Sequence, residues 1–373
     1  MEIFVLPNSI GRLKNLKYLL LSECKNMLEL PKSIGKLESL VKLDLESLGI
    51  SVLPYSVGKL KDLNYLLLSH CKNMVQLPES IGELESLVKL DLELSGISVL
   101  PYSIGNLKNL DHLLLYNCMN MLQLPESIGE LESLVELDLS LLEITVLPNS
   151  IGGLKNLNYL LLARCKNLHK LPDSIGKLQA LVKLDLHLSG IFVLPHSIGS
   201  LTSLKYLSLS ECKNLQDLPD SIGELESLVT LGLKLLGISV LPNSIRRLKN
   251  LQYLLLSECK NLHEVPDSIG ELKSLFELDL NLLGISALPD SIGRLKNLKH
   301  LRLRECKNLH ELPDSIGELK SLVELDLELS GIAILPNSIG RLTNFTHLSF
   351  SGCENLLELP DSIGNCNHYS SWI

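Results

Sequence analysis

Aromatic side chains are scarce in this sequence. They make up 4% of its 373 residues, although 45% of the residues are hydrophobic, so the hydrophobic content is mostly leucine, isoleucine and valine. Basic charge is also in deficit, because 34 lysines and arginines stand against 43 aspartates and glutamates, for a net charge of −9. An acidic surface repels phosphate backbones and anionic lipid, so we expect neither a nucleic-acid partner nor a membrane partner.

Membrane spans and export signals are missing as well. No hydrophobic run approaches the roughly 18 residues that a membrane-spanning helix needs. The first residues, MEIFVLPNSIG, carry an acidic side chain instead of a basic one, and no long hydrophobic segment follows. This start is not typical of a secretory signal peptide. The sequence therefore predicts a cytoplasmic protein, or a piece of a larger one.

Catalytic motifs are absent too. The sequence has no GxxxxGK[ST] nucleotide-binding loop, no protein-kinase signature, no GxSxG and no HExxH. Its ten histidines do not cluster with the spacing of metal ligands. His300 and His347 would lie about 10 Å apart in a sheet, too far to hold one ion. We expect no enzymatic activity, no cofactor and no metal site.

What the sequence does contain is a repeat with a constant period of 47 residues. Eight cysteines recur at this period, from Cys24 and Cys71 to Cys353. The sixteen prolines are spaced alternately by 24 and 23 residues, so each period holds a long unit (53–76, LPYSVGKLKDLNYLLLSHCKNMVQ) and a short unit (77–99, LPESIGELESLVKLDLELSGISV). Serine follows every Leu-Pro after one residue. Glycine comes two positions later in all copies but one, where Arg246 replaces it. Such periodicity predicts a solenoid with one continuous core.

Each unit predicts a strand followed by a short helical turn. Leu66 and Leu68 have the period of two that places side chains on one face of a strand. The SIGxLxxL segment has a spacing nearer 3.6, which favours a short helix or 3₁₀ turn. Proline ends the extended segment before it, and we expect the glycine to permit a tight turn. Stacked units would form a parallel sheet on the inner side of a curve.

The LxxLxLxxC and LxxLxLxxxGI patterns are those of leucine-rich repeats, and they cover essentially the whole chain. The finer pattern LPxSIGxLxxLxxLxLSxCKNLxxLP resembles the repeat regions of plant intracellular nucleotide-binding resistance receptors and of plant Ras-group repeat proteins. The resemblance implies an α/β leucine-rich repeat solenoid, with a parallel sheet on the concave side and short helical or 3₁₀ segments on the convex side. We expect a single domain over residues 1–373 with 15 to 16 repeats, ending in an irregular tail at 362–373.

The resemblance also implies a function in protein recognition. The chain would be the sensing or regulatory repeat region of a plant-type intracellular immune receptor, or a derivative of one. The alternative is a free-standing intracellular scaffold that binds a small GTPase or a kinase module in signal transduction. Neither end of the sequence looks like a polar cap, so missing domains, a second molecule or fraying must account for the ends. The sequence does not indicate the oligomeric state.

The repeated cysteine has a structural interpretation. Equivalent cysteines would lie two strands apart, about 10 Å, which is beyond the reach of a disulfide. The short units place leucine or serine at this position, such as Leu48 and Ser95, so no thiolate cluster for a metal can form. We therefore expect a buried cysteine that acts as a small hydrophobic residue with a weak donor. Asn73 and its equivalents would satisfy backbone groups nearby. Only Cys366 is a candidate for an exposed thiol.

The side chains that flank the strand leucines would face the concave surface. Their repeated tyrosine and leucine are typical of a protein interface. A second interpretation is that duplication copied neutral residues, and that Lys42 and Asp44 simply pair. The candidate protein-binding residues are Tyr18, Leu20, Tyr65, Leu67, His112, Leu114, Tyr159, Leu161, Tyr206, Tyr253, Leu255, His300, Arg302, Arg304, Asp44, Asp91, Asp138, Asp185, Asp279 and Asp326.

Departures from the repeat predict local features of this surface. Between Tyr206 and Arg247 the pattern loosens, which predicts a shallow notch near the middle of the arc at Ser208, Gly232, Lys234 and Arg246. Further on, Arg302 would lie between Asp279 and Asp326 on adjacent strands. Two interpretations stay open for Arg302 and Arg304, namely a local charge network and a contact specific to a partner.

Overall fold

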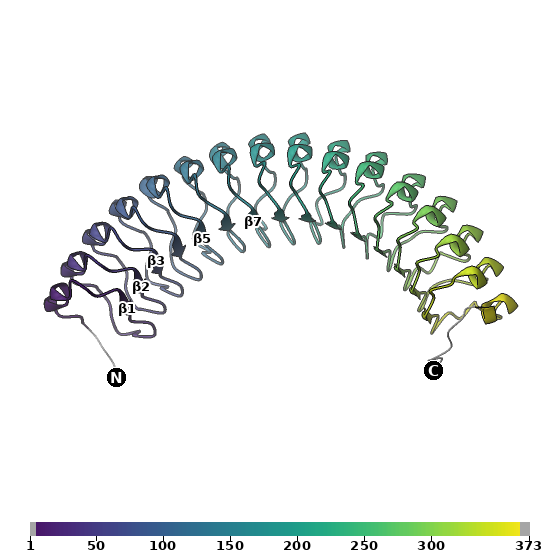
Figure 1. Cartoon of the computed structure of the whole chain (residues 1–373), viewed down its shortest axis with the longest axis horizontal. Coiled ribbons are helices and arrows are strands. Elements are labelled where there is room, and N and C mark those ends of the chain that lie inside the picture. The colour runs from purple at the N-terminus through teal and green to yellow at the C-terminus, as the bar shows by residue number, and fades with distance from the viewer. Residues whose placement is uncertain (1–4, 366–373) are drawn as a thin grey trace. The chain divides into compact units, whose positions relative to one another are not determined.

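The structure, a computed structural model, describes residues 5–365. Its chain divides into two compact units, unit 1 at Met1–Asp185 and unit 2 at Leu186–Ile373. Each unit is a stack of repeats, and in each repeat a three-residue strand is followed by a five-residue 3₁₀ turn. Within each unit, Figure 1 shows the strands along the inner edge of a curve and the turns spread along its outer edge.

In residues 5–185, unit 1 contains eight parallel strands, each paired with the next along the chain. The register is constant, since leucine pairs with leucine at the middle position of every strand. The strands are β1 (Tyr18–Leu20), β2 (Lys42–Asp44), β3 (Tyr65–Leu67), β4 (Lys89–Asp91), β5 (His112–Leu114), β6 (Glu136–Asp138), β7 (Tyr159–Leu161) and β8 (Lys183–Asp185).

The described part of unit 2, residues 186–365, contains seven parallel strands in the same arrangement. They are β9 (Tyr206–Ser208), β10 (Thr230–Gly232), β11 (Tyr253–Leu255), β12 (Glu277–Asp279), β13 (His300–Arg302), β14 (Glu324–Asp326) and β15 (His347–Ser349). The predicted fold class, a leucine-rich repeat solenoid with parallel strands, is confirmed.

The SIGxLxxL segments form 3₁₀ turns, as the spacing predicted. A proline in extended conformation precedes each of the first fifteen turns. The turns of unit 1 are η1 (Asn8–Arg12), η2 (Lys32–Lys36), η3 (Tyr55–Lys59), η4 (Glu79–Glu83), η5 (Tyr102–Asn106), η6 (Glu126–Glu130), η7 (Asn149–Gly153) and η8 (Asp173–Lys177). Those of unit 2 are η9 (His196–Ser200), η10 (Asp220–Glu224), η11 (Asn243–Arg247), η12 (Asp267–Glu271), η13 (Asp290–Arg294), η14 (Asp314–Glu318), η15 (Asn337–Arg341) and η16 (Asp361–Asn365).

The last turn, η16, lies where an irregular tail was expected from residue 362. Serine and isoleucine of the repeat still follow the proline there, so the turn forms once more. The rest of the expected tail, with the candidate exposed thiol of Cys366, lies outside the described residues.

The core is a ladder of leucines between the sheet and the turns. Leu63, Leu66 and Leu68 are fully buried, and their equivalents in the other internal repeats are too. Burying one such side chain stabilises the fold by roughly 1.5–3 kcal/mol. No repeat can bury its leucines alone, so stability comes from stacking.

The turn glycine has a different role from the one predicted. Among the described glycines only Gly352 has a positive φ, so a tight turn is not what requires this residue. Instead, the serine of the next repeat packs against it. A β-carbon on Gly129 would lie 2.1 Å from the carbonyl oxygen of Ser150. Glycine therefore sets the distance between successive turns.

Positive φ angles occur at residues other than glycine in the turn after each strand from β1 to β14. In unit 1 they have φ between 55° and 65°, and leucine takes this position in several short units. The left-handed conformation costs such residues about 1–2 kcal/mol. Hydrogen bonds to the next repeat hold it in place, such as the one from the Leu94 amide to the Tyr116 carbonyl at 2.8 Å. Nothing in the amino-acid pattern signals this feature, because leucine rarely adopts it.

The cysteines of the internal repeats are buried, as expected. The Cys71 thiol donates to the carbonyl of Leu45 at 3.1 Å, and five other buried cysteines make the same bond over 26 residues at 2.9–3.1 Å. Each thiol thus links one long unit to the preceding short unit. Burial raises the pKa of Cys71, Cys259 and Cys306 to about 11, and that of Cys165 to about 12.

The asparagine two residues after the cysteine supports the same turn in five repeats. Asn73 donates to the carbonyl of Gly49 at 3.2 Å, and Asn120, Asn261, Asn308 and Asn355 make the equivalent bond.

We expect Asn73→Ala to lower the free energy of unfolding by about 0.5–1 kcal/mol, because a partly exposed hydrogen bond is lost. Guanidinium unfolding of the full chain measures this difference. Lys72→Ala, an exposed neighbour, is the control and should leave the midpoint unchanged. Equal midpoints for the two variants would contradict the role of the asparagine.

Candidate protein-binding surface

In most strands the first and third residues are exposed or half-buried and the middle one is buried, although the third residue is also buried in β9, β10 and β12. In β3, for example, Leu66 is fully buried while Tyr65 is 43% exposed. Side chains alternate in this way along any strand. We call the surface formed by these first and third residues the strand face. All the candidate binding residues belong to it except Arg304, which follows β13 by two positions.

Unit 1 carries the most exposed aromatic and aliphatic residues of the strand face. Tyr18 and Leu20 are 61% and 59% exposed, and Tyr65 and Tyr159 are 43% and 42% exposed. The remaining candidates of this kind in unit 1 are half-buried, namely Leu67, His112, Leu114 and Leu161. Exposed tyrosine beside leucine on a rigid sheet is a composition typical of protein interfaces.

The aspartates of unit 1 already have partners within the chain. Lys42 pairs with Asp44 at 3.3 Å, Lys89 with Asp91 at 3.6 Å and Lys183 with Asp185 at 3.9 Å. A second oxygen of Asp44 and Asp91 accepts from the backbone amide two residues further on. Asp138 accepts the same bond from the Ser140 amide at 2.9 Å. These contacts support a structural role for the aspartates.

A carboxyl group just beyond the strands of unit 1 has a perturbed pKa. Burial, and then the charges of Asp91 and Asp138, raise the pKa of Glu93 above its usual value.

The charged residues on the strand face of unit 2 pair differently from what the register alone suggests. The register does place Arg302 between Asp279 and Asp326. Its guanidinium, however, pairs with Glu277 at 2.9 Å. Asp279 is 2% exposed and pairs with Lys234 at 3.3 Å, so it is covered from solvent.

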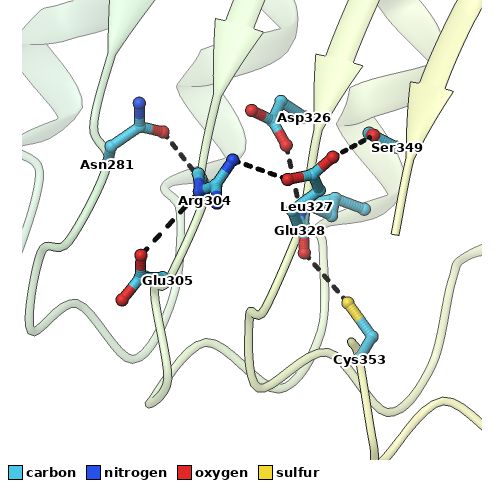
Figure 2. Close-up of polar contacts among 8 residues, drawn as sticks. All are labelled: Asn281, Arg304, Glu305, Asp326, Leu327, Glu328, Ser349 and Cys353. Carbon is cyan, nitrogen blue, oxygen red and sulfur yellow. Dashed lines mark hydrogen bonds and ion pairs between the residues drawn. The ribbon is translucent and has the colours of Figure 1, made fainter. Parts of the chain in front are cut away.

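Arg304 is the centre of a second network beyond β13 (Figure 2). Its guanidinium contacts Glu328 at 2.6 Å and Glu305 at 3.8 Å, and its backbone amide donates to the Asn281 side chain at 2.8 Å. Glu328 also accepts a hydrogen bond from Ser349 at 3.0 Å. Burial raises the pKa of Asp326, which accepts from the Glu328 amide. The interpretation as a local charge network is therefore supported.

The predicted notch is only partly assembled. Ser208 and Gly232 lie side by side on β9 and β10, both buried, with Leu255 next to them in register. Arg246 does not belong to this group, because it lies in turn η11 at the opposite edge of its repeat from the strands. The depth of a notch at Ser208 stays a prediction.

An aromatic cluster on unit 2 was missed by sequence reasoning. The ring of Phe276 lies 5.8 Å from that of Tyr253 and 5.2 Å from that of His300, centroid to centroid. Lys299 places its ammonium 5.1 Å from the Phe276 ring. The available signal was the replacement by Phe276 of the valine that precedes most short-unit strands.

Two further findings concern chemistry and membranes. Over residues 5–365, the structure brings together no three side chains of histidine, cysteine, aspartate or glutamate that could hold a metal ion. In the same range no helix has the length and hydrophobicity to cross a bilayer.

A family model described as a leucine-rich repeat region matches residues 6–76, 63–139, 194–284 and 287–368. The chain belongs to the leucine-rich repeat family. A leucine-rich repeat protein of Leptospira interrogans, LIC12759, is 36% identical, with a TM-score of 0.82 over 94% of this chain and 88% of that one. Among curated proteins none matches.

Two other similar structures were solved as complexes with a ligand. The Arabidopsis receptor kinase HAESA ectodomain, in complex with an extended IDA peptide hormone, is 26% identical, with a TM-score of 0.59 over 96% of this chain and 66% of that one. The TLR13–ssRNA13 complex is 25% identical, with a TM-score of 0.78 over 94% of this chain and 51% of that one. Peptide and RNA are thus ligands of those two proteins.

Proposed function

We propose that this leucine-rich repeat protein is a non-catalytic module that recognises a protein partner through the strand face of unit 1. The observation that carries the proposal is the exposure of Tyr18, Leu20, Tyr65 and Tyr159 on rigid strands, while neighbouring lysines and aspartates pair with one another. Interface energy usually concentrates in a few such aromatic residues. The paired charges leave the surface close to neutral, which suits an apolar partner segment.

The proposed cellular role rests on the resemblance of the repeat pattern alone. By its LPxSIG repeats the chain would be a cytoplasmic sensing or regulatory region of a plant-type immune receptor, active in plant defence and disease resistance. The alternative role is a scaffold for a small GTPase or kinase module. The 36% identical structure is bacterial, so it does not favour a plant origin. The exclusion of nucleic acid rests on the net charge of −9, and the TLR13 complex shows that a similar protein takes RNA.

Substitution of exposed tyrosines tests the proposed surface. The double variant Tyr65→Ser/Tyr159→Ser should weaken capture of a partner protein at least tenfold, because each buried aromatic contact is worth about 1–2 kcal/mol or more. The matched control is Tyr55→Ser/Tyr102→Ser, which removes two tyrosines of 66% and 65% exposure from turns η3 and η5.

The measurement is quantitative pull-down with the immobilised full chain, followed by titration of the captured protein. Equal loss in both double variants, or no loss in the strand-face variant, would remove the strand face of unit 1 from consideration. Capture of RNA instead of protein would overturn the assignment of the partner class.

A further inference from the structure

A second exposed row lies outside the strand face, on the segment that leads from each strand to the next Leu-Pro. Neighbouring repeats pair along it, since Gln76 and Val99 form a parallel bridge and the Ser98 amide donates to the Val75 carbonyl at 2.9 Å. In unit 1 we call this row, from the second Leu-Pro to the eighth, the exit flank. It consists of the residue before each of these Leu-Pro pairs: Glu29, Val52, Gln76, Val99, Gln123, Val146 and Lys170.

The exit flank is unusually apolar for an exposed surface. Its three valines are 51–53% exposed, and the residues one position earlier in the long units, Leu28, Val75 and Leu122, are 55–63% exposed. Six successive repeats therefore each present one aliphatic side chain. Together they expose on the order of 500 Å², as large as the biggest patches of ordinary monomers, which are often functional.

The residue types along the exit flank are symmetric about its centre, except that the two charged ends have opposite sign. Val99 is the centre, with a glutamine, then a valine, then a charged residue on each side. The two terminal charges have opposite sign, Glu29 at one end and Lys170 at the other, and both side chains are exposed. A two-fold contact sets a surface against itself in reverse order. An axis at Val99 would therefore place Glu29 of each copy opposite Lys170 of the other.

We propose that the exit flank of unit 1 is a homodimer interface, in which two copies of this chain pack antiparallel about an axis at Val99. Valine then meets valine, glutamine meets glutamine, and an ion pair closes each end. Seven repeats span about 30 Å at the strand spacing, which is long enough for a standard interface of about 800 Å² per partner. The proposal does not rest on the function proposed for the strand face.

Unit 2 shows why the contact is confined to unit 1. There the equivalent row alternates an apolar residue with an acidic one: Val193, Asp217, Val240, Glu264, Ala287, Glu311, Ile334 and Glu358. If two copies packed antiparallel through that row, carboxylates of one copy would face carboxylates of the other. Like charges face to face oppose association. The side chains of the exit flank thus fit a second copy, whereas those of unit 2 repel one.

Sedimentation equilibrium of the full chain, from about 1 to 200 µM, tests the interface, because a dimer of this size without buried hot spots has a micromolar Kd. Val99→Glu places two carboxylates on the axis and should raise the Kd at least 100-fold. The matched control, Val240→Glu, changes a valine of similar exposure in unit 2 and should leave the Kd within about twofold. Circular dichroism confirms that each variant is folded.

Charge exchange tests the antiparallel register. Glu29→Lys alone and Lys170→Glu alone should each weaken self-association about tenfold, because two like-charge contacts replace two ion pairs. An equimolar mixture of these two variants should dimerise as tightly as the unaltered chain. In the mixed dimer, positions 29 and 170 of opposite copies again carry opposite charges at both ends of the interface.

Several results would overturn the proposal. A chain that stays monomeric at about 200 µM rules the dimer out. If such a monomer binds phosphatidylserine vesicles, the exit flank contacts lipid and not a second copy. A dimer that tolerates Val99→Glu uses another surface. Failure of the mixture to recover affinity rules out the antiparallel register.

Discussion

Raising the pH from 9 to about 11 is expected to destabilise this protein by on the order of 10 kcal/mol through its cysteine ladder. The cause is burial, which raises the pKa of four thiols from 9.0 in the unfolded chain to about 11 or 12 in the fold. Each thiol contributes about 3 kcal/mol at 1.36 kcal/mol per pKa unit.

The sign follows from proton binding. Below pH 9 the thiol is protonated in both states, so its contribution is fully present. Between pH 9 and about 11 the unfolded chain releases protons that the folded chain keeps, and stability falls as the pH rises.

Guanidinium unfolding of the reduced protein at several pH values measures the effect. Cys165→Val removes one titrating thiol, so its stability should fall by about 4 kcal/mol less than that of the parent between pH 9 and about 12. All other groups are the same in both proteins, so their effect on stability cancels in the difference. Leu168→Ala, a buried neighbour without a proton to lose, should lower stability equally at every pH. Parallel curves for the parent and Cys165→Val would refute the role of the thiol.

Gly129→Ala is expected to cost the fold about 2–4 kcal/mol, because its added methyl group makes the shortest such contact among the described glycines of unit 1. Its β-carbon would lie 2.1 Å from the carbonyl oxygen of Ser150 and 2.8 Å from that residue's β-carbon. Both atoms belong to Ser150 in the next 3₁₀ turn, so the backbone of η7 would have to move away from η6. Every repeat beyond would lose packing with it.

Gly237→Ala is the matched control. The nearest atom to its β-carbon would be the Lys213 carbonyl oxygen at 3.4 Å, an ordinary contact, and its φ is not positive. Loss of chain entropy in the unfolded state should leave this variant unchanged or stabilise it by up to about 1 kcal/mol. Thermal and guanidinium unfolding of both variants provides the comparison. Equal midpoints for Gly129→Ala and Gly237→Ala would show that turn packing does not require the glycine.

The architecture could be predicted from the sequence because every repeat has the same pattern of residues that favour a strand, a turn and a buried core. Leucines spaced by two define a strand, proline ends the extended segment before the turn, and the 47-residue period leaves stacking as the only way to bury those leucines. The buried cysteine followed from the same geometry, since strand spacing excludes a disulfide. The strand-face list followed from alternation along the strands, and whether it binds a partner stays a prediction.

Contacts between repeats could not be read from the sequence. They depend on the positions of side-chain ends and backbone groups in neighbouring repeats, which the repeat pattern does not specify. Arg302 stands in register with two aspartates, yet its long side chain reaches Glu277 while Lys234 covers Asp279. Glycine in the SIG segment is required by a carbonyl in the next repeat, and leucines adopt left-handed angles because bonds across the stack hold them. Sequence alone determined the repeat, its strand and its core. Tertiary structure decided the pairing of charges and the spacing of turns, because both arise only when one repeat lies against another.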